Sequence, residues 1–344
     1  MKKIKIAVLD SGLDSDMMQE LKAKNQIIGK KSFYYDYYSE KVIAGEETED
    51  QNGHGTCCVS VMLQHFSEVE FYIIKMLNVS GMANGSVLAA ALDFAASLDV
   101  DIVSVCASLL VRQQDTVIQD LCRKIYESGK LLFTSVRNRC LSSEPACYPT
   151  VVGVIGDMGE EGSYGWCSEY EIQMKCSARA VIVKELFGCR GVFQGNSKAT
   201  AEAVAIAAKL MYQYDARGTA LYAVLEEHAA EQQFQAEILE DYDDIILRTP
   251  FDMEQEEHLI QTEERYQRFI YCLCEFLTWD DPQEVRAADL LEFSERKIVR
   301  RLENFIRFIQ ERFHVKLDFL QLDNLRFAYL FYLNYLRNQG ENHE

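Results

Sequence analysis

The first two thirds of the chain alternate short apolar runs with longer segments in which apolar residues recur every third or fourth position. Short runs rich in valine, isoleucine and leucine are typical of strands buried on both faces, whereas the three-to-four spacing predicts helices that bury one face. The predicted strands span 4–10, 70–77, 100–106, 130–136 and 150–156, and the predicted helices between them span 86–98 and 117–128.

Strands that alternate with helices of this length predict an α/β fold, in which helices flank a parallel sheet built from right-handed crossovers. Binding sites in such sheets lie at the carboxyl ends of the strands. Asp10 ends the first predicted strand, so we expect it at that edge of the sheet.

The pattern changes after Tyr214. Between Gly218 and Thr262 there are twelve Asp or Glu residues and one Arg, with weak periodicity, which predicts a solvated acidic connector that could include a short helix or edge strand. Beyond it, the apolar residues of 295–313 form one helical stripe, and helices over 264–278 and 324–337 are predicted to pack on it. The sequence therefore predicts an α/β domain, a connector and a small helical domain, over 1–217, 218–262 and 263–344.

Composition narrows the function classes. A formal charge of −19 argues against a nucleic-acid partner, because phosphates require a basic surface. The sequence shows no secretory signal and no apolar run of the ~20 residues that cross a membrane, so we expect a soluble, cytoplasmic protein without a membrane partner. The eleven cysteines lie scattered in apolar runs without CxxC spacing. They are therefore predicted to be reduced, mostly buried thiols and not metal ligands.

Four short motifs carry the candidate chemistry: VLDSGLD around Asp10, NGHGT around His54, SVRNRC around Asn138 and GNSKATA around Ser197. A serine hydroxyl becomes a nucleophile when a neighbouring imidazole takes its proton, and a carboxylate can orient that imidazole. Taken singly, Asp10 could belong to a simple turn after a strand, His54 could be an ordinary loop residue and Ser197 could be a helix N-cap. Their joint occurrence favours a catalytic set.

Together these motifs resemble the subtilisin-like serine proteases, whose chain order is aspartate, histidine, oxyanion asparagine and serine. The resemblance covers about residues 4–213. It implies a serine endopeptidase in which Ser197 attacks a peptide bond, His54 transfers the proton and Asp10 orients His54. It also implies that the Asn138 amide and the Ser197 backbone N–H stabilise the oxyanion.

The resemblance further implies that two backbone stretches flank an extended peptide substrate. Arg137, next to the oxyanion asparagine, either narrows the pocket for the residue before the cleaved bond, or favours an acidic residue there, or points to solvent. The implied substrate-binding residues are Gly81, Met82, Ala83, Cys106, Ala107, Ser108 and Arg137.

The chain departs from the family pattern in several places. The usual GTSMATP reads GNSKATA here, which leaves the catalytic atoms in place. Only three residues precede the first predicted strand, where secreted relatives carry a signal and an inhibitory pro-segment, so we expect selective intracellular maturation of a precursor or leader peptide. No cofactor is expected to be required. Calcium often stabilises the family, and a structural calcium ion stays an open alternative here, although no compelling acidic loop has EF-hand spacing.

The C-terminal part leaves several interpretations open. Residues 311–336 are faintly similar to acyl or peptidyl carrier domains, but the Asp-Ser-Leu attachment site of those domains is absent. This part could dock a partner protein, form a dimer contact or only support the protease. The alternative for the whole chain is a catalytically silent peptide-binding or adaptor module that kept the cleft without turnover.

Overall fold

The computed structural model describes residues 2–106, 116–235, 251–277, 281–288, 290, 302–317 and 320–338. Ala107 and Ser108, two of the predicted substrate-binding residues, lie outside these ranges. The chain forms two compact units, one of residues 1–179 with 183–242 and the other of residues 180–182 with 243–344. The predicted boundary at residue 217 falls inside the first unit, and each unit is described by itself below.

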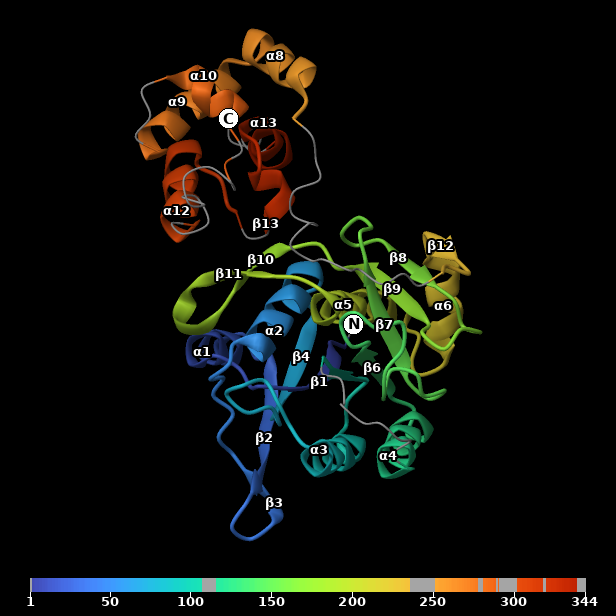
Figure 1. Ribbon diagram of the computed structural model, residues 1–344. Helices are drawn as coiled ribbons and strands as arrows, with labels where there is room; N and C mark the ends of the chain where they lie inside the picture. Colours follow the sequence, from blue (N-terminus) through green and yellow to red (C-terminus); the bar gives the residue numbers. More distant parts are fainter. Residues whose placement is uncertain are drawn as a thin grey trace. The chain divides into compact units, whose positions relative to one another are not determined.

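The first unit is built on a ten-stranded sheet with the order β12-β8-β9-β7-β6-β5-β1-β4-β2-β3 (Figure 1). Its five central strands pair in parallel, which confirms the predicted α/β fold. These strands correspond to the five apolar runs: β1 (Ile4–Asp10), β4 (Val69–Lys75), β5 (Ile102–Val105), β6 (Leu131–Ser135) and β7 (Val152–Asp157).

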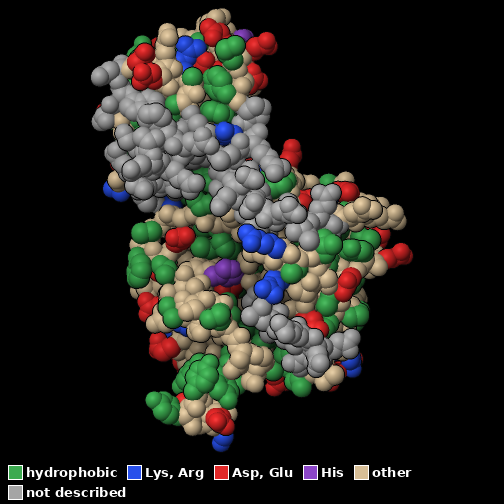
Figure 2. Space-filling model, viewed as in Figure 1, with side chains coloured by type: hydrophobic (Ala, Val, Ile, Leu, Met, Phe, Trp, Pro, Cys, Tyr) green, Lys and Arg blue, Asp and Glu red, His purple; other side chains and the backbone are tan. Residues whose placement is uncertain are grey.

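The outer strands are absent from the sequence prediction. β2 (Ile27–Asp36) pairs in parallel with β4 and turns back into β3 (Lys41–Gly45) as an antiparallel hairpin. Most of the hairpin residues are only partly buried, so the hairpin lacks the continuous apolar run of a central strand. Figure 2 shows hydrophobic side chains in green at its tip. The other side of the sheet ends in β9 (Met174–Ser177), β8 (Tyr164–Trp166) and β12 (Glu231–Gln232).

Helices cover both faces of this sheet (Figure 1). α3 (Gly85–Ser97) and α4 (Thr116–Glu127) pack together on one face and share a core with β1, β4 and β5. α2 (His54–His65) and α5 (Asn196–Tyr214) pack together on the other face. Nearly all of α5 is buried, because its alanines let neighbouring elements approach closely. Two shorter helices, α1 (Ser15–Ala23) and α6 (Ala220–His228), also belong to this unit.

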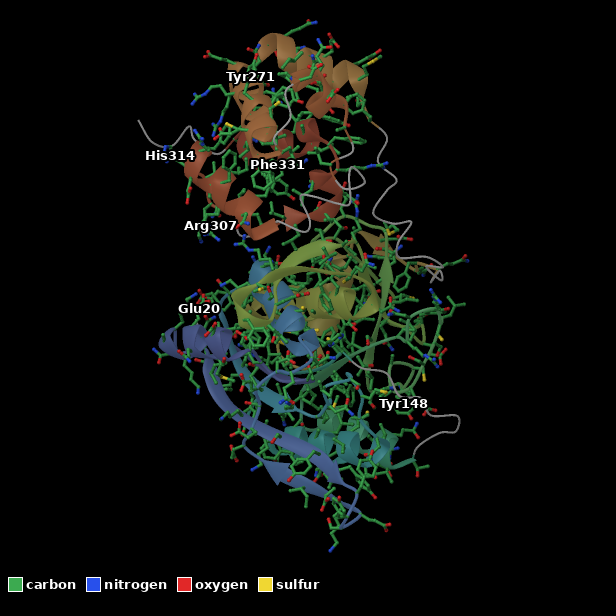
Figure 3. The ribbon with its side chains drawn as sticks, turned by 60° about the vertical axis from the view of Figure 1, so that its left-hand side comes forward. Glu20, Tyr148, Tyr271, Arg307, His314 and Phe331 are labelled. Atoms are coloured by element: carbon green, nitrogen blue, oxygen red, sulfur yellow. The ribbon has the colours of Figure 1, made fainter. Side chains whose placement is uncertain are left out.

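The second unit is mostly helical. It contains α8 (Met253–Thr262), α9 (Glu264–Leu277), α10 (Pro282–Ala287), α12 (Leu302–Phe313) and α13 (Ala328–Phe331). Phe331 stacks on Phe269 with ring centroids 5.4 Å apart and lies inside the unit, whereas Tyr271 points outward (Figure 3). Residues 180–182 join this unit through β10 (Val181–Lys184), whose Val181 and Ile182 pair with β13 (Leu320–Gln321).

The continuous helix predicted over 324–337 is wrong. A 3-10 turn over Leu322–Leu325 comes first, then α13, then a π turn over Tyr332–Leu336. Because the helix type changes along the segment, its aromatic residues do not follow one face, and they can be buried on several sides. The buried aromatic residues here are Phe327, Tyr329, Phe331 and Tyr332.

Candidate active site

Asp10 and His54 form the best-defined pair of the site. Asp10 is the last residue of β1 and is 1% exposed. His54 is the first residue of α2, and its Nδ1 lies 2.8 Å and 3.0 Å from the two carboxylate oxygens of Asp10. This contact leaves Nε2 as the ring nitrogen that can exchange a proton with another group.

The two glycines around His54 each have a structural reason. Gly53, which precedes the first residue of α2, has φ +96°, a conformation that L side chains rarely adopt. At Gly55 an added Cβ would lie 2.4 Å from the carbonyl oxygen of Gly12 and 3.1 Å from the Cβ of Asp10. A larger residue at position 55 would therefore push the start of α2 away from the end of β1 and lengthen the Asp10–His54 contact.

Asp50 is a site residue that the sequence analysis missed. It is 4% exposed and accepts hydrogen bonds from the backbone N–H groups of Asn52, Gly53 and Thr56 at 2.8–3.0 Å, and from the Thr56 hydroxyl at 2.7 Å. Burial alone would raise the pKa of Asp50, but these hydrogen bonds lower it below its usual value. Asp50 thus holds the turn that sets where His54 begins α2. The DQNG pattern before His54, typical of an Asx turn, was the available signal.

The electrostatics of the pair favour a charged imidazole. Burial alone would lower the pKa of His54, because it disfavours the imidazolium. The charge of Asp10 and its hydrogen bond outweigh burial and raise the pKa of His54 to about 9. Asp10 therefore stabilises the imidazolium that forms when His54 takes a proton.

Ser197 lies in the first turn of α5 and is partly buried. Its Oγ donates to the carbonyl oxygen of Cys106 at 3.1 Å, and among the described residues no hydrogen bond joins it to His54. Cys106 borders both groups, because its Sγ lies within 4.8 Å of a carboxylate oxygen of Asp10. The structure thus brings Asp10 and His54 into direct contact, and Ser197 bonds to Cys106, which borders Asp10.

Asn138 lies beside the start of α5. Its side-chain oxygen accepts a hydrogen bond from the backbone N–H of Asn196 at 3.3 Å, one residue before Ser197. Asn196 in turn donates through its side-chain nitrogen to the Val136 carbonyl at 2.9 Å. These two bonds join the loop after β6 to the residue before Ser197. Arg137 in the same loop is exposed, and its backbone N–H donates to Ser143 at 2.8 Å.

The other predicted substrate-binding residues differ in their surroundings. Met82 and Ala83 line a cavity of about 620 Å³ that also contacts the β2–β3 hairpin through Tyr35 and Tyr37. Gly81, in the turn just before Met82, has φ +71°. Cys106 is 3% exposed and meets the site through two groups, its carbonyl oxygen, which accepts the Ser197 hydroxyl, and its Sγ, which lies near Asp10.

A buried ionic cluster lies directly behind Ser197. The fully buried ammonium of Lys198 bonds to Glu161, to Glu202 at 2.7 Å and to the Ser177 carbonyl at 3.1 Å. His65 contacts Glu161 at 3.4 Å. His65, Glu161 and Glu202 have donor atoms close enough to hold a metal ion, but the Lys198 ammonium already bonds to both carboxylates. The sequence analysis noted Lys198 only as a departure from the family motif and missed its partners.

Comparison with known proteins identifies the family. Residues 1–242 match the model of the subtilase family, peptidase S8, which covers more than half of the 344 residues. The chain belongs to the subtilase family. This membership confirms the resemblance found in the motifs, and the protein is a serine-type endopeptidase.

Solved structures agree on the fold of this subtilase. Sphericase superposes with a TM-score of 0.54 at 19% identity, covering 68% of this chain and 87% of sphericase. A cold adapted subtilisin-like serine proteinase superposes with a TM-score of 0.54 at 16% identity, covering 70% of this chain and 90% of that protein. No curated protein sequence matches the chain. Within the described residues, no helix is both long and apolar enough to cross a membrane.

Proposed function

We propose that this subtilase cleaves peptide bonds with Ser197 as nucleophile, His54 as general base and acid, and Asp10 as the residue that orients His54. The contact of 2.8 Å between the buried Asp10 carboxylate and His54 Nδ1 is the observation that carries this assignment. A carboxylate at Nδ1 selects the tautomer with a free Nε2 and stabilises the imidazolium that forms during catalysis.

In the proposed reaction, the Ser197 hydroxyl turns from the Cys106 carbonyl toward His54 Nε2 when substrate enters. His54 takes the hydroxyl proton while Oγ attacks the substrate carbonyl, and then gives the proton to the leaving amine. An acyl-enzyme remains and is hydrolysed by water through the same proton transfers. This reorientation of the Ser197 hydroxyl exchanges one hydrogen bond for another, so its energetic cost is small.

The oxyanion hole is proposed to consist of the Asn138 amide and the Ser197 backbone N–H. Ser197 lies in the first turn of α5, where backbone N–H groups have no partner within the helix and favour negative charge. Asn138 is close enough to that turn to bond to Asn196. Loss of one such donor typically lowers kcat by about 10²–10³.

Substrate choice is proposed to be narrow, as for an intracellular protease that matures one precursor or leader peptide. Two features support a selective cleft. The cavity beside Met82 and Ala83 is lined largely by aromatic and aliphatic side chains, which suits an apolar substrate residue. Arg137 carries an exposed guanidinium next to Asn138, which suits an acidic residue near the cleaved bond.

Labelling with a fluorophosphonate probe tests the assignment, because the probe reacts with a serine that a base has activated. We expect the wild type to be labelled at Ser197 and Ser197→Ala to be unlabelled, with Ser97→Ala, an exposed serine on α3, as the matched control. A wild type that cleaves peptides while another serine carries the label would contradict the triad.

Digestion of a peptide library tests the cleft. We expect acidic residues to be enriched beside the cleaved bond, and Arg137→Ala to remove that enrichment. Arg139 is also exposed and lies two residues further along the loop, so Arg139→Ala is the control. Equal cleavage patterns for the two variants would refute a role of Arg137 in substrate choice.

A further inference from the structure

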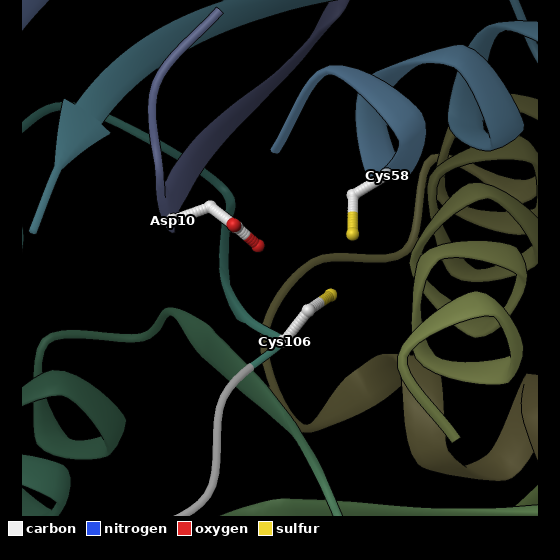
Figure 4. A group of neighbouring side chains, drawn as sticks. All are labelled: Asp10, Cys58 and Cys106. Carbon is white, nitrogen blue, oxygen red and sulfur yellow. The ribbon is translucent and has the colours of Figure 1, made fainter. Parts of the chain in front are cut away.

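Two buried cysteines, Cys58 of α2 and Cys106 at the end of β5, point toward the same space as Asp10 (Figure 4). We propose that Asp10, Cys58 and Cys106 form a binding site for a thiophilic divalent cation, zinc, and that zinc bound there switches off the protease. The regulatory part of this inference rests on the proposed triad, whereas the metal site itself does not.

The geometry of the three side chains suits one ion. A carboxylate oxygen of Asp10 and the two Sγ atoms all lie within 4.8 Å of one another. Zinc bound tetrahedrally holds sulfur at about 2.3 Å and oxygen at about 2.0–2.2 Å, so its ligand atoms are about 3.5–3.8 Å apart. A contraction of about 1 Å or less, within reach of side-chain rotation, would therefore close the three atoms on the ion.

His54 lies beside this group of three and is the proposed fourth ligand. Its Nδ1 lies 2.8 Å from Asp10 and 3.8 Å from the Sγ of Cys58. Its side chain is 26% exposed, whereas Asp10, Cys58 and Cys106 are at most 3% exposed, so the ion would enter past the histidine ring. The complete set of one carboxylate, one imidazole and two thiolates gives a closed, four-coordinate site.

The ligand chemistry selects the metal. Thiolates and imidazole favour zinc over calcium and magnesium, which prefer oxygen ligands. Each thiol loses one proton on binding and the imidazolium of His54 loses a third, so zinc, the Asp10 carboxylate, the imidazolium and the two thiols give the complex and three released protons. Two thiolates and one carboxylate then offset the two positive charges and leave one negative charge on the site. A dication neutralised in this way can be held in a buried position.

Zinc at this site would block the proposed catalysis in two ways. With Nδ1 bound to the metal, the neutral imidazole of His54 carries its hydrogen on Nε2, so it cannot take the Ser197 proton. Asp10 is also a ligand and no longer stabilises an imidazolium. Cys106 also contacts the nucleophile directly, because its carbonyl oxygen accepts a hydrogen bond from the Ser197 hydroxyl.

Metal binding is tested on the full chain without reference to activity. Cobalt is the probe, because cobalt bound to thiolates has strong charge-transfer absorption that zinc abolishes by displacement. We expect one cobalt per chain with this absorption in the wild type. Cys58→Ala should weaken metal binding at least about 100-fold. Loss of a residue that only hydrogen-bonds to a metal ligand already costs about 10–100-fold, and loss of the ligand itself costs more. Cys57→Ala is the matched control, because Cys57 is the neighbouring buried cysteine on α2 and is not in this group.

Thiolate absorption that is equal in the wild type and in Cys58→Ala would overturn the site. The switch is then tested by fluorophosphonate labelling of Ser197. We expect zinc to suppress labelling of the wild type and of Cys57→Ala, a chelator to restore it, and Cys58→Ala to need at least about 100-fold more zinc. If cobalt binds as described but Ser197 is never labelled, the metal site holds and the proposed triad fails.

Two further outcomes would refute the switch. Labelling that zinc leaves unchanged in a chain with one bound ion would show that the ion does not control the serine. Inhibition that a reductant reverses and a chelator does not, with a mass lower by two hydrogens, would assign Cys58 and Cys106 to a disulfide instead of a metal site.

Discussion

Replacing Lys198 by methionine, the residue usual in the family motif, tests the buried ionic cluster behind Ser197. In the wild type one ammonium bonds to both Glu161 and Glu202. Lys198 and Glu202 are fully buried and Glu161 is nearly so. Methionine fills a similar volume but leaves two carboxylates without the cation, so we expect Lys198→Met to destabilise the first unit strongly.

The magnitude follows from the burial of the pair. Removing one partner of a buried ion pair costs about 3–5 kcal/mol, because the other charge stays uncompensated in a medium of low polarity. For a unit of this size, 1 kcal/mol shifts the melting temperature by about 2–4 °C. The expected loss is therefore roughly 6–20 °C. Lys209→Met is the matched control, because Lys209 lies on the same helix and is exposed, and we expect it to change the melting temperature little.

The cost should depend on pH in a defined direction. Burial raises the pKa of Glu202 to about 7, with Lys198 opposing the rise. The folded chain thus keeps a proton on Glu202 that the unfolded chain releases above about pH 4.5, and this contribution to stability is lost as the pH rises through about 7. Without Lys198 the pKa rises further, so the destabilisation should be larger at pH 8 than at pH 5.5.

Urea unfolding followed by tryptophan fluorescence gives the free energy of unfolding of the first unit, which holds the buried Trp166. Adding Glu202→Gln removes one uncompensated charge, so the double variant should be more stable than Lys198→Met alone by about 1–3 kcal/mol. Lys198→Met that is as stable as the wild type at pH 8, or a double variant less stable than the single one, would refute the reasoning.

Other predictions concern the catalytic groups directly. Asp10→Asn should lower kcat by about 10⁴ in a peptide assay, because the amide no longer holds the required tautomer of His54; an unchanged kcat would contradict its role. In the wild type kcat/KM should rise with pH to a midpoint near 9, where His54 loses its proton, and the midpoint of Asp10→Asn should fall below that value. Asn138→Ala should lower kcat by about 10²–10³ with little change in KM, and a change confined to KM would argue against an oxyanion role. Asp50→Asn should cost about 1–3 kcal/mol in urea unfolding, because it weakens several buried hydrogen bonds to the turn before α2; a neutral variant would contradict this.

The central part of the fold could be predicted because its physical cause is local. Strands buried on both faces need continuous apolar runs, and the five runs became β1, β4, β5, β6 and β7 within a few residues. The β2–β3 hairpin was missed, since its residues are only partly buried and its pairing is decided by a partner, β4, far along the chain. The helix over 324–337 failed for a related reason, because aromatic packing from several sides overrode the single-face pattern.

For the site, four short motifs and their order along the chain were sufficient to name Asp10, His54, Asn138 and Ser197 as candidates. They were not sufficient to find Asp50, whose role consists of hydrogen bonds to backbone groups of a neighbouring turn. The same holds for the partners of Lys198. Glu161 lies 37 residues before it in the chain, and no periodicity relates the two.

The sequence by itself determined the family, the parallel core and the four residue types that the proposed chemistry requires, because these depend on local patterning and on short motifs. The tertiary structure alone decided that Cys58 of α2 and Cys106, the residue after β5, meet beside Asp10 and that Lys198 is enclosed by carboxylates. Contacts of this kind depend on how the crossovers bring separate strand ends and helix starts to one edge of the sheet. Neither the composition nor the spacing of residues along the chain predicts which of them come into contact there.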